Sequence, residues 1–148
     1  MTLYAESSAV LAWLLEQEHG ARVAAALAEA EIVVASDLTL IECDRVLVRA
    51  ITLRELLESD AIQRQARLHA VSTRWALLAL DEETVERARR PFPSEPIRTL
   101  DAIHVASALT ARKGLPDLAV LSLDDRVRKA AGRLGFPLVP GDEHLGTS

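Results

Sequence analysis

Short apolar runs alternate along this chain with longer segments in which apolar residues recur every three or four positions. The short runs are rich in aliphatic and β-branched residues, which is typical of buried strands. Strands are therefore expected at residues 2–5, 32–35, 75–78, 118–121 and 137–139. Helices are expected between them, over residues 9–16, 20–30, 37–51, 52–72, 81–90, 99–113 and 124–134. For residues 75–78, a helical extension of the preceding segment fits the pattern almost as well.

Strands that alternate with helices are typical of a mainly parallel sheet with helices on both faces. We therefore expect a three-layer α/β/α fold in which prolines enforce a loop over residues 91–96. The carboxyl ends of parallel strands share one edge of the sheet, and ligand sites form at that edge. A single domain over residues 1–140 is expected to be followed by a frayed tail at 141–148.

The composition fits one globular domain. The 148 residues are 49% hydrophobic but only 3% aromatic, so the core is expected to consist of aliphatic side chains. The net charge of -5 argues against general attraction to nucleic acid, although a nuclease can concentrate its acids in a metal pocket. Two groups of basic residues are expected on solvated helix faces, namely Arg87, Arg89 and Arg90, and Arg126, Arg128, Lys129 and Arg133.

Cys43 is the single cysteine, which excludes a disulfide within the chain and a cysteine-based metal site. It is expected to be a small buried hydrophobe. The N-terminal segment lacks the basic region of a secretion signal, and no apolar run is long enough to span a bilayer. These features predict a cytoplasmic protein of a reducing compartment, with no membrane partner.

Four acidic residues stand where a strand is expected to end or a helix to begin: Glu6, Glu42, Asp101 and Asp124. In the expected fold, such positions can meet at one edge of the sheet. Carboxylates that gather from distant parts of a chain repel one another unless a cation holds them. The pattern therefore indicates a metal site.

Each acid also has a purely structural interpretation. Glu6 and Asp101 stand in a first helical turn, where the helix dipole favours a negative charge. Glu42 has Arg45 and Arg49 on nearly the same stripe of its helix, so a surface ion pair explains it as well.

Asp124 is a suitable N-cap for the last long helix. Ser122 is a rival cap and Asp125 a rival acid, and spacing does not choose among them. His104 shares a helix edge with Asp101 and can hydrogen-bond its carboxylate, but a structural histidine with satisfied partners explains it equally well.

Four short segments, taken in order, resemble the PIN-domain family and in particular its VapC-type toxins. They are Tyr4–Val10, Ser36–Glu42, Leu100–Ala106 and Ser122–Asp124. The Leu-Asp-Ala-Ile-His segment is the most specific of them, and the hydroxyl-x-Asp segment favours Asp124 over Asp125. The resemblance extends over residues 2–139 and implies a PIN-like fold.

The resemblance implies a metal-dependent endoribonuclease, the toxin of a toxin–antitoxin pair. In such an enzyme, Glu6, Asp101 and Asp124 would hold Mg²⁺ or Mn²⁺, and Glu42 would orient a water molecule or share in coordination. The resemblance further implies an RNA substrate, a cognate antitoxin protein and a homodimer. Ser7, Ser122 and His104 would support the acids as their neighbours. Arg98, three residues before Asp101, is a candidate RNA phosphate contact, although a solvent-exposed arginine is the more common case.

Glu6 departs from the family pattern, in which the first acid is usually Asp. The additional methylene moves the carboxylate by about 1.5 Å, and Mg²⁺ requires near-ideal octahedral geometry. This departure supports an alternative, a catalytically weak PIN-fold module that binds RNA or a partner protein without cleaving. A phosphohydrolase on a similar sheet would need a nucleophilic Asp motif after the first strand, and the sequence has none.

Overall fold

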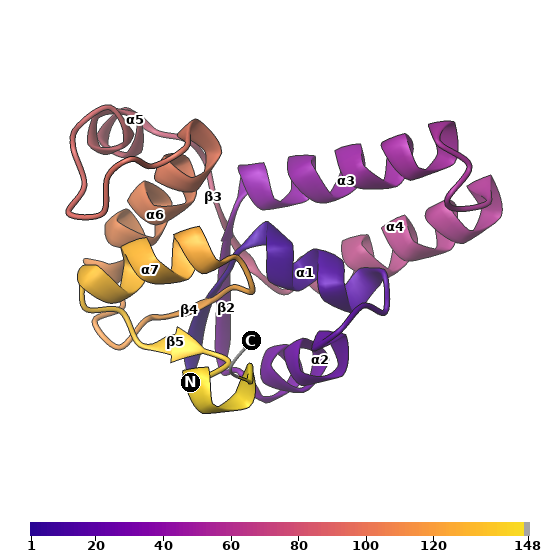
Figure 1. Ribbon diagram of the computed structural model, residues 1–148, viewed down its shortest axis with the longest axis horizontal. Coiled ribbons are helices and arrows are strands. Elements are labelled where there is room, and N and C mark those ends of the chain that lie inside the picture. The colour runs from indigo at the N-terminus through magenta and orange to yellow at the C-terminus, as the bar shows by residue number, and fades with distance from the viewer. Residues whose placement is uncertain (147–148) are drawn as a thin grey trace.

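Five parallel strands form a single sheet in the computed structural model, which describes residues 1–146 (Figure 1). The strand order is β3-β2-β1-β4-β5, so the first strand occupies the centre. The strands are β1 Thr2–Ala5, β2 Ile32–Ser36, β3 Ala76–Leu78, β4 Ala119–Leu121 and β5 Leu138–Val139. All five expected strands are confirmed, and the helical alternative for residues 75–78 is wrong.

The expected helices also form, with one error in their bounds. The fourth helix starts at Glu58 instead of residue 52, because Arg54 adopts a positive φ of 58° and ends the preceding helix. The helices are α1 Ser7–Leu14, α2 Gly20–Glu29, α3 Asp37–Thr52, α4 Glu58–Ser72, α5 Glu82–Ala88, α6 Thr99–Arg112 and α7 Asp125–Arg133.

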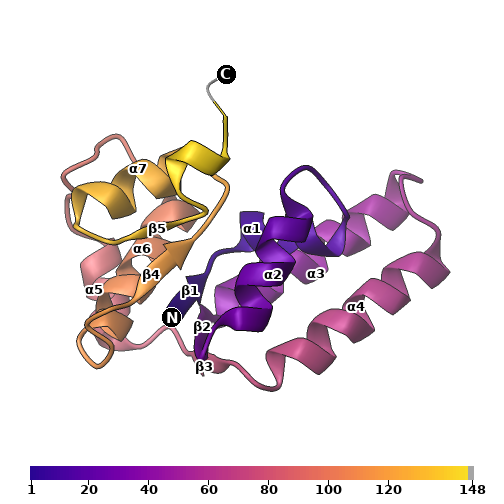
Figure 2. The same cartoon turned by 90° about the horizontal axis from the view of Figure 1, so that it is seen from below.

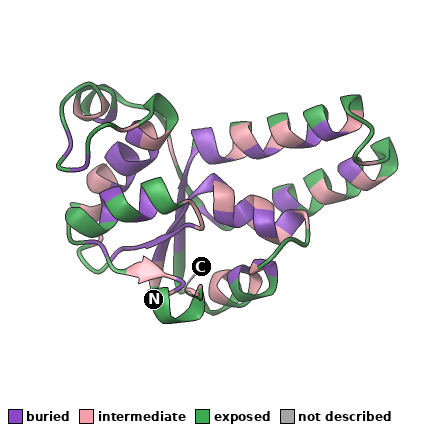
Figure 3. Cartoon of the chain, in the orientation of Figure 1, coloured by how far each residue is buried: buried purple, intermediate pink, exposed green. Residues whose placement is uncertain are grey.

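The helices form one layer on each face of the sheet (Figure 2). Alternate residues of β1 point to opposite faces, so that Leu3 and Ala5 pack against α1 to α4 while Tyr4 packs against α6 and α7. Helix α5 packs on the outside of α6. The three inner strands β1, β2 and β4 and the inward faces of the helices are mostly buried, whereas the edge strands β3 and β5 are exposed or intermediate (Figure 3). This arrangement confirms the three-layer α/β/α fold.

Two basic side chains that were expected on solvated faces are instead packed against the protein. Arg128 is 4% exposed, donates to the Ser122 carbonyl at 3.0 Å, and binds Asp142 at 2.8 Å. The guanidinium of Arg87 lies 4.1 Å from the centre of the Phe92 ring.

The C-terminal segment does not fray immediately after β5. Asp142–His144 forms a 3-10 turn, and the bond from Asp142 to Arg128 attaches this turn to α7. The last two residues, 147–148, lie outside the described residues. The division into a domain over 1–140 and a tail stays a prediction. Among the described residues, no helix combines the length and the apolar character needed to cross a membrane.

Candidate active site

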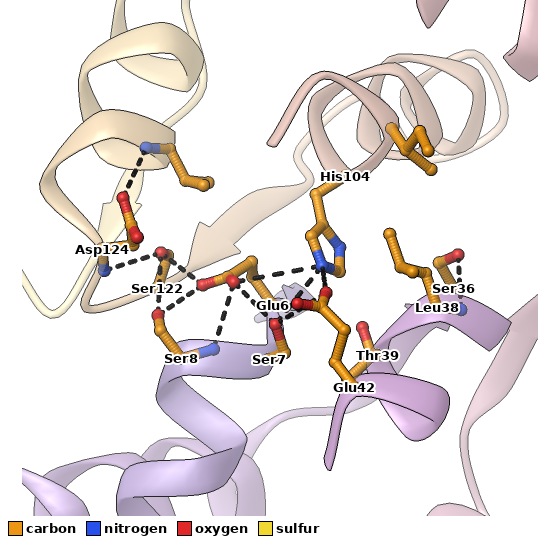
Figure 4. Close-up of polar contacts among 12 residues, drawn as sticks. Glu6, Ser7, Ser8, Ser36, Leu38, Thr39, Glu42, His104, Ser122 and Asp124 are labelled. Carbon is orange, nitrogen blue, oxygen red and sulfur yellow. Dashed lines mark hydrogen bonds and ion pairs between the residues drawn. The ribbon is translucent and has the colours of Figure 1, made fainter. Parts of the chain in front are cut away.

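Glu6 follows β1 directly and is 4% exposed. It caps the N-terminus of α1, since its Oε1 accepts the backbone N–H of Ser8 at 3.1 Å. Three hydroxyl groups also donate to the carboxylate: Ser7 Oγ at 2.9 Å, Ser122 Oγ at 2.7 Å, and Ser8 Oγ in a short bond. The cap of α1 is therefore Glu6 (Figure 4).

Two of these serines also accept hydrogen bonds from the loop between β4 and α7. The backbone N–H of Leu123 donates to Ser8 Oγ at 2.9 Å, and that of Asp124 donates to Ser122 Oγ at 3.1 Å. This loop and the start of α1 are thereby connected through Glu6, which binds both hydroxyls.

Glu42 extends from α3 toward the same edge of the sheet. Thr39, one turn earlier, donates to the carbonyl of Ala5 at 2.9 Å and so fixes the start of α3 against the end of β1. Glu42 Oε1 lies 2.5 Å from His104 Nε2 and accepts from Ser7 Oγ at 3.0 Å. The surface ion pair expected with neighbouring arginines on α3 is not formed among the described residues.

His104 is 1% exposed and lies between two partners on opposite sides of its ring. Its Nδ1 is 2.9 Å from the hydroxyl of Tyr4, and its Nε2 faces Glu42. The structural interpretation of this histidine, with both ring nitrogens satisfied, is therefore confirmed. The alternative partner that the sequence suggested, Asp101, is not the one that His104 binds.

Asp101 occupies the first turn of α6. Its Oδ2 is buried and has no hydrogen-bond partner among the described residues. Burial raises the pKa of this carboxyl above its ordinary value, and the negative charges of Asp124 and Glu6 raise that pKa further. Three of the four predicted acids are therefore within electrostatic reach of one another, and one of them carries an unsatisfied oxygen.

Asp124 caps the N-terminus of α7. Its Oδ1 accepts the backbone N–H groups of Arg126 at 2.8 Å and Val127 at 3.2 Å, which leaves Oδ2 directed away from these two bonds. Asp125 is exposed in the first turn of the helix. The structure thus distinguishes the two neighbouring acids, because only Asp124 contributes to the electrostatics of Asp101.

The donor chemistry of the site fits a hard divalent cation. Carboxylate oxygens are the ligands that Mg²⁺ and Mn²⁺ prefer, and the buried Oδ2 of Asp101 has no other partner. However, no three His, Cys, Asp or Glu side chains within residues 1–146 are arranged as a group that would hold a metal ion. The assignment of three direct ligands, Glu6, Asp101 and Asp124, therefore stays a prediction.

Arg98 occupies the cap position before α6 and is exposed. Its positive charge lowers the pKa of Asp101 and so opposes the other influences on that carboxyl. Beside this position, a cleft of about 700 Å³ runs along α3. Its lining combines Glu42 and the two arginines Arg45 and Arg49 with apolar side chains that include Ile41, Val48 and Leu100.

Sequence reasoning missed the roles of three residues. Tyr4 is the single tyrosine of the chain, yet its contact with His104 depends on a separation of 100 residues. Ser8 was not assigned to the site, and Arg128 was expected on a solvated face. The one available signal was the Ser-Ser pair after Glu6, which places two hydroxyls next to a carboxylate.

The chain matches known proteins along most of its length. The sequence model of the PIN domain matches residues 3–133. The chain is 37% identical over 93 residues to ribonuclease VapC46 of Mycobacterium tuberculosis, a match that covers 63% of this chain and 68% of that protein.

Solved structures show the same fold. FitAcB from Neisseria gonorrhoeae superimposes with a TM-score of 0.67 at 20% identity, covering 93% of this chain and 96% of that one. VapC20 from Mycobacterium tuberculosis, a toxin that cleaves the sarcin–ricin loop, superimposes with a TM-score of 0.62 at 16% identity, covering 90% and 95%. From its sequence match and its architecture, the chain belongs to the PIN domain family.

Proposed function

We propose that this protein is a metal-dependent endoribonuclease and the toxin of a toxin–antitoxin pair. The observation that carries the proposal is the buried, unpartnered Oδ2 of Asp101, next to the charges of Asp124 and Glu6. A buried carboxylate oxygen without a partner is costly, and a divalent cation satisfies it. The similarity to ribonuclease VapC46 supports RNA as the substrate.

A bound Mg²⁺ or Mn²⁺ would supply positive charge that stabilises the phosphate as charge develops on it. Asp101 and Asp124 would hold the ion, with Glu6 as the third acid of the site. Glu42 is proposed to orient the attacking water and accept its proton at Oε2, since Oε1 is engaged by His104 and Ser7. Binding to His104 restricts the rotation of this carboxylate and so prepares it for that role.

The RNA backbone is proposed to follow the cleft along α3. Arg45 and Arg49 line this cleft, and Arg98 stands at the start of α6 beside Asp101. These arginines supply positive charge to a chain whose net charge is -5, so phosphate contacts are concentrated near the acids. Affinity for RNA should therefore fall as the salt concentration rises.

The partners proposed for this chain are those of VapC-type toxins: a cognate antitoxin protein and a second copy of the chain, in the cytoplasm. Several large apolar side chains are exposed on α3, including Ile41 at 55% and Val48 at 45%. Exposed apolar residues that gather along one helix are typical of surfaces that a partner covers.

The proposal is tested with purified protein and structured RNAs, incubated with Mn²⁺, with Mg²⁺ and with EDTA. Cleavage is expected with a divalent cation and not with EDTA. Asp101→Asn should abolish cleavage while its circular dichroism spectrum stays unchanged. The matched control is Asp125→Asn, which alters the exposed neighbour of Asp124 and should retain activity. Cleavage by Asp101→Asn at the wild-type rate would refute the proposal.

A second candidate function is a catalytically weak PIN-fold module that binds RNA or a partner protein. The observation that favours it is the carboxylate of Glu6, whose oxygens are already engaged by Ser7, Ser8 and Ser122. Glu6→Asp distinguishes the two candidates, because a large gain in cleavage would mean that the native site is impaired.

A further inference from the structure

We propose that Glu6 is a positioning residue and not a direct metal ligand. Glu6 binds the hydroxyls of Ser8 and Ser122, and these bonds connect the start of α1 with the loop in which Asp124 lies. The cation is bound by Asp101 and Asp124. The inference rests on the proposed function and assigns a different task to the one acid that departs from the family pattern.

The acceptor capacity of Glu6 is the first argument. An ionised carboxylate has about four lone-pair sites. Oε1 accepts from Ser8 N–H and shares the single Ser7 hydroxyl proton with Glu42, and Oε2 accepts from Ser8 Oγ and Ser122 Oγ. These bonds engage both oxygens. Direct coordination of a cation would require at least one of them to break inside a site where Glu6 is 4% exposed.

The direction of the hydroxyl protons is the second argument. Ser8 Oγ accepts the N–H of Leu123, and Ser122 Oγ accepts the N–H of Asp124. Each hydroxyl therefore directs its own proton to Glu6, and hydrogen bonds that are linked in this way strengthen one another. The result is a continuous connection from the loop amides, through two serines, to the cap of α1.

The contrast with Asp101 is the third argument. The two acids lie within electrostatic reach of each other, yet Asp101 Oδ2 is buried and unpartnered while Glu6 is fully engaged. The described residues also contain no ready group of three metal-binding side chains. Two carboxylates with several retained water molecules are a usual environment for Mg²⁺.

The longer side chain of Glu6 explains this division of tasks. Ser122 belongs to the segment after β4, whereas Ser7 and Ser8 begin α1. Glu6 reaches Ser122 Oγ at 2.7 Å while its other oxygen still caps α1 through Ser8 N–H. An aspartate, shorter by about 1.5 Å, would have to give up one side of this connection.

The experiment measures Mn²⁺ affinity by electron paramagnetic resonance of the free ion, and thermal unfolding in EDTA. The variants are Glu6→Gln, the double variant Ser8→Ala/Ser122→Ala, the triple variant that combines them, and Asp101→Asn. Thr73→Ala, which removes an exposed hydroxyl at the end of α4, is the matched control. All variants are compared with the wild-type chain.

If Glu6 acts through the serines, the double variant should lose Mn²⁺ affinity by about 10-fold or more, as expected for groups that orient ligands. Glu6→Gln should lose a similar amount, and the triple variant should lose no more than either. The melting temperature in EDTA should fall in all three, but not in Asp101→Asn. If the double variant does not fold, Ser122→Ala alone supplies the same comparison.

The inference is overturned if removing the serines leaves Mn²⁺ affinity unchanged or raises it while Glu6→Gln lowers it. That pattern would mean that the hydroxyls compete with the metal for a direct ligand. A separate result would instead contradict the proposed function, namely a wild-type chain that binds no Mn²⁺, or an Asp101→Asn variant that binds it as well as the wild type. The two failures are therefore distinguishable.

Discussion

His104 Nε2 and Glu42 Oε1 lie 2.5 Å apart, although the two residues are 62 positions apart in the chain. Burial raises the pKa of the Tyr4 hydroxyl, so the group stays neutral and can donate to His104 Nδ1. In the corresponding neutral tautomer, Nε2 carries the ring proton and donates it to Glu42. The histidine thus joins the central strand, α6 and α3 through one ring.

Replacing this histidine should destabilise the fold through its unsatisfied neighbours. His104→Ala leaves the buried Tyr4 hydroxyl without its ring partner and opens a cavity, so a loss of roughly 1–3 kcal/mol or more is expected. Urea unfolding followed by circular dichroism measures it. His104→Gln, which retains an N–H donor for Glu42, should lose less. Equal stability of the wild type and His104→Ala would contradict the importance of this contact.

Glu42→Gln should separate catalysis from metal binding. The amide removes the proton acceptor but keeps an oxygen for His104, so kcat on an RNA substrate should fall by about 10²-fold or more. Mn²⁺ affinity should change little, since Asp101 and Asp124 are the proposed ligands. The measurement pairs single-turnover cleavage with metal titration. A variant that loses metal affinity in proportion to its rate would instead identify Glu42 as a ligand.

The ionisation of Asp101 should destabilise the metal-free protein as the pH rises. The pKa of Asp101 is raised in the folded state above its ordinary value of 3.8. Between pH 3.8 and the higher pKa of the folded state, the folded protein therefore binds more protons at this carboxyl than the unfolded chain does. Stability is then lost as Asp101 ionises. Asp101→Asn should therefore melt at a higher temperature than the wild type in EDTA at pH 7, as thermal unfolding followed by circular dichroism would measure.

The comparison of melting temperature between the wild type and Asp101→Asn has an internal control in its pH dependence. Well below pH 3.8, the wild-type carboxyl is neutral in both states, so the difference in melting temperature should vanish. Saturating Mn²⁺ at pH 7 should make the wild type melt at the higher temperature of the two, because only the wild type is stabilised by binding the ion. A wild-type protein that is the more stable of the two in EDTA at pH 7 would contradict the prediction.

Arg128 should contribute strongly to the stability of the fold, whereas its ion-pair partner Asp142 should contribute little. Arg128→Met removes the donor to the Ser122 carbonyl from a side chain that is 4% exposed, and a loss of about 1–3 kcal/mol is expected. Asp142, in contrast, has a side chain that is 88% exposed, so Asp142→Asn should change stability by less than about 1 kcal/mol. Thermal unfolding of both variants tests the contrast, and similar losses in both would refute it.

The sequence predicted the sheet well because each strand is a short apolar run between clear helix boundaries. The start of α4 was missed because a positive φ at Arg54 is set by the turn and not by apolar spacing. The four acids were proposed as site residues from their positions at element boundaries, and this assignment stays a prediction. Their partners were not identified, because contacts such as Tyr4 with His104 depend on which helix covers which face of the sheet.

Sequence patterns also do not show which charged side chains are buried or cap a helix. Arg128 belongs to a basic run that resembles an exposed helix face, and only the packing of α7 against the end of β4 buries it. Spacing alone does not choose between Asp124 and Asp125, whereas the cap geometry of α7 separates them. Patterns along the chain therefore identify elements and candidate residues, while the pairing of side chains requires the three-dimensional arrangement.

The central position of β1 has a consequence for synthesis on the ribosome. Glu6 is among the first residues to be translated, but its neighbouring strand β4 and Asp124 come more than 100 residues later. A nascent chain that ends before β4 lacks both Ser122 and Asp124 and leaves one side of β1 without its partner strand. Translation products that end before β4 therefore cannot bring Asp124 and Ser122 together with Glu6.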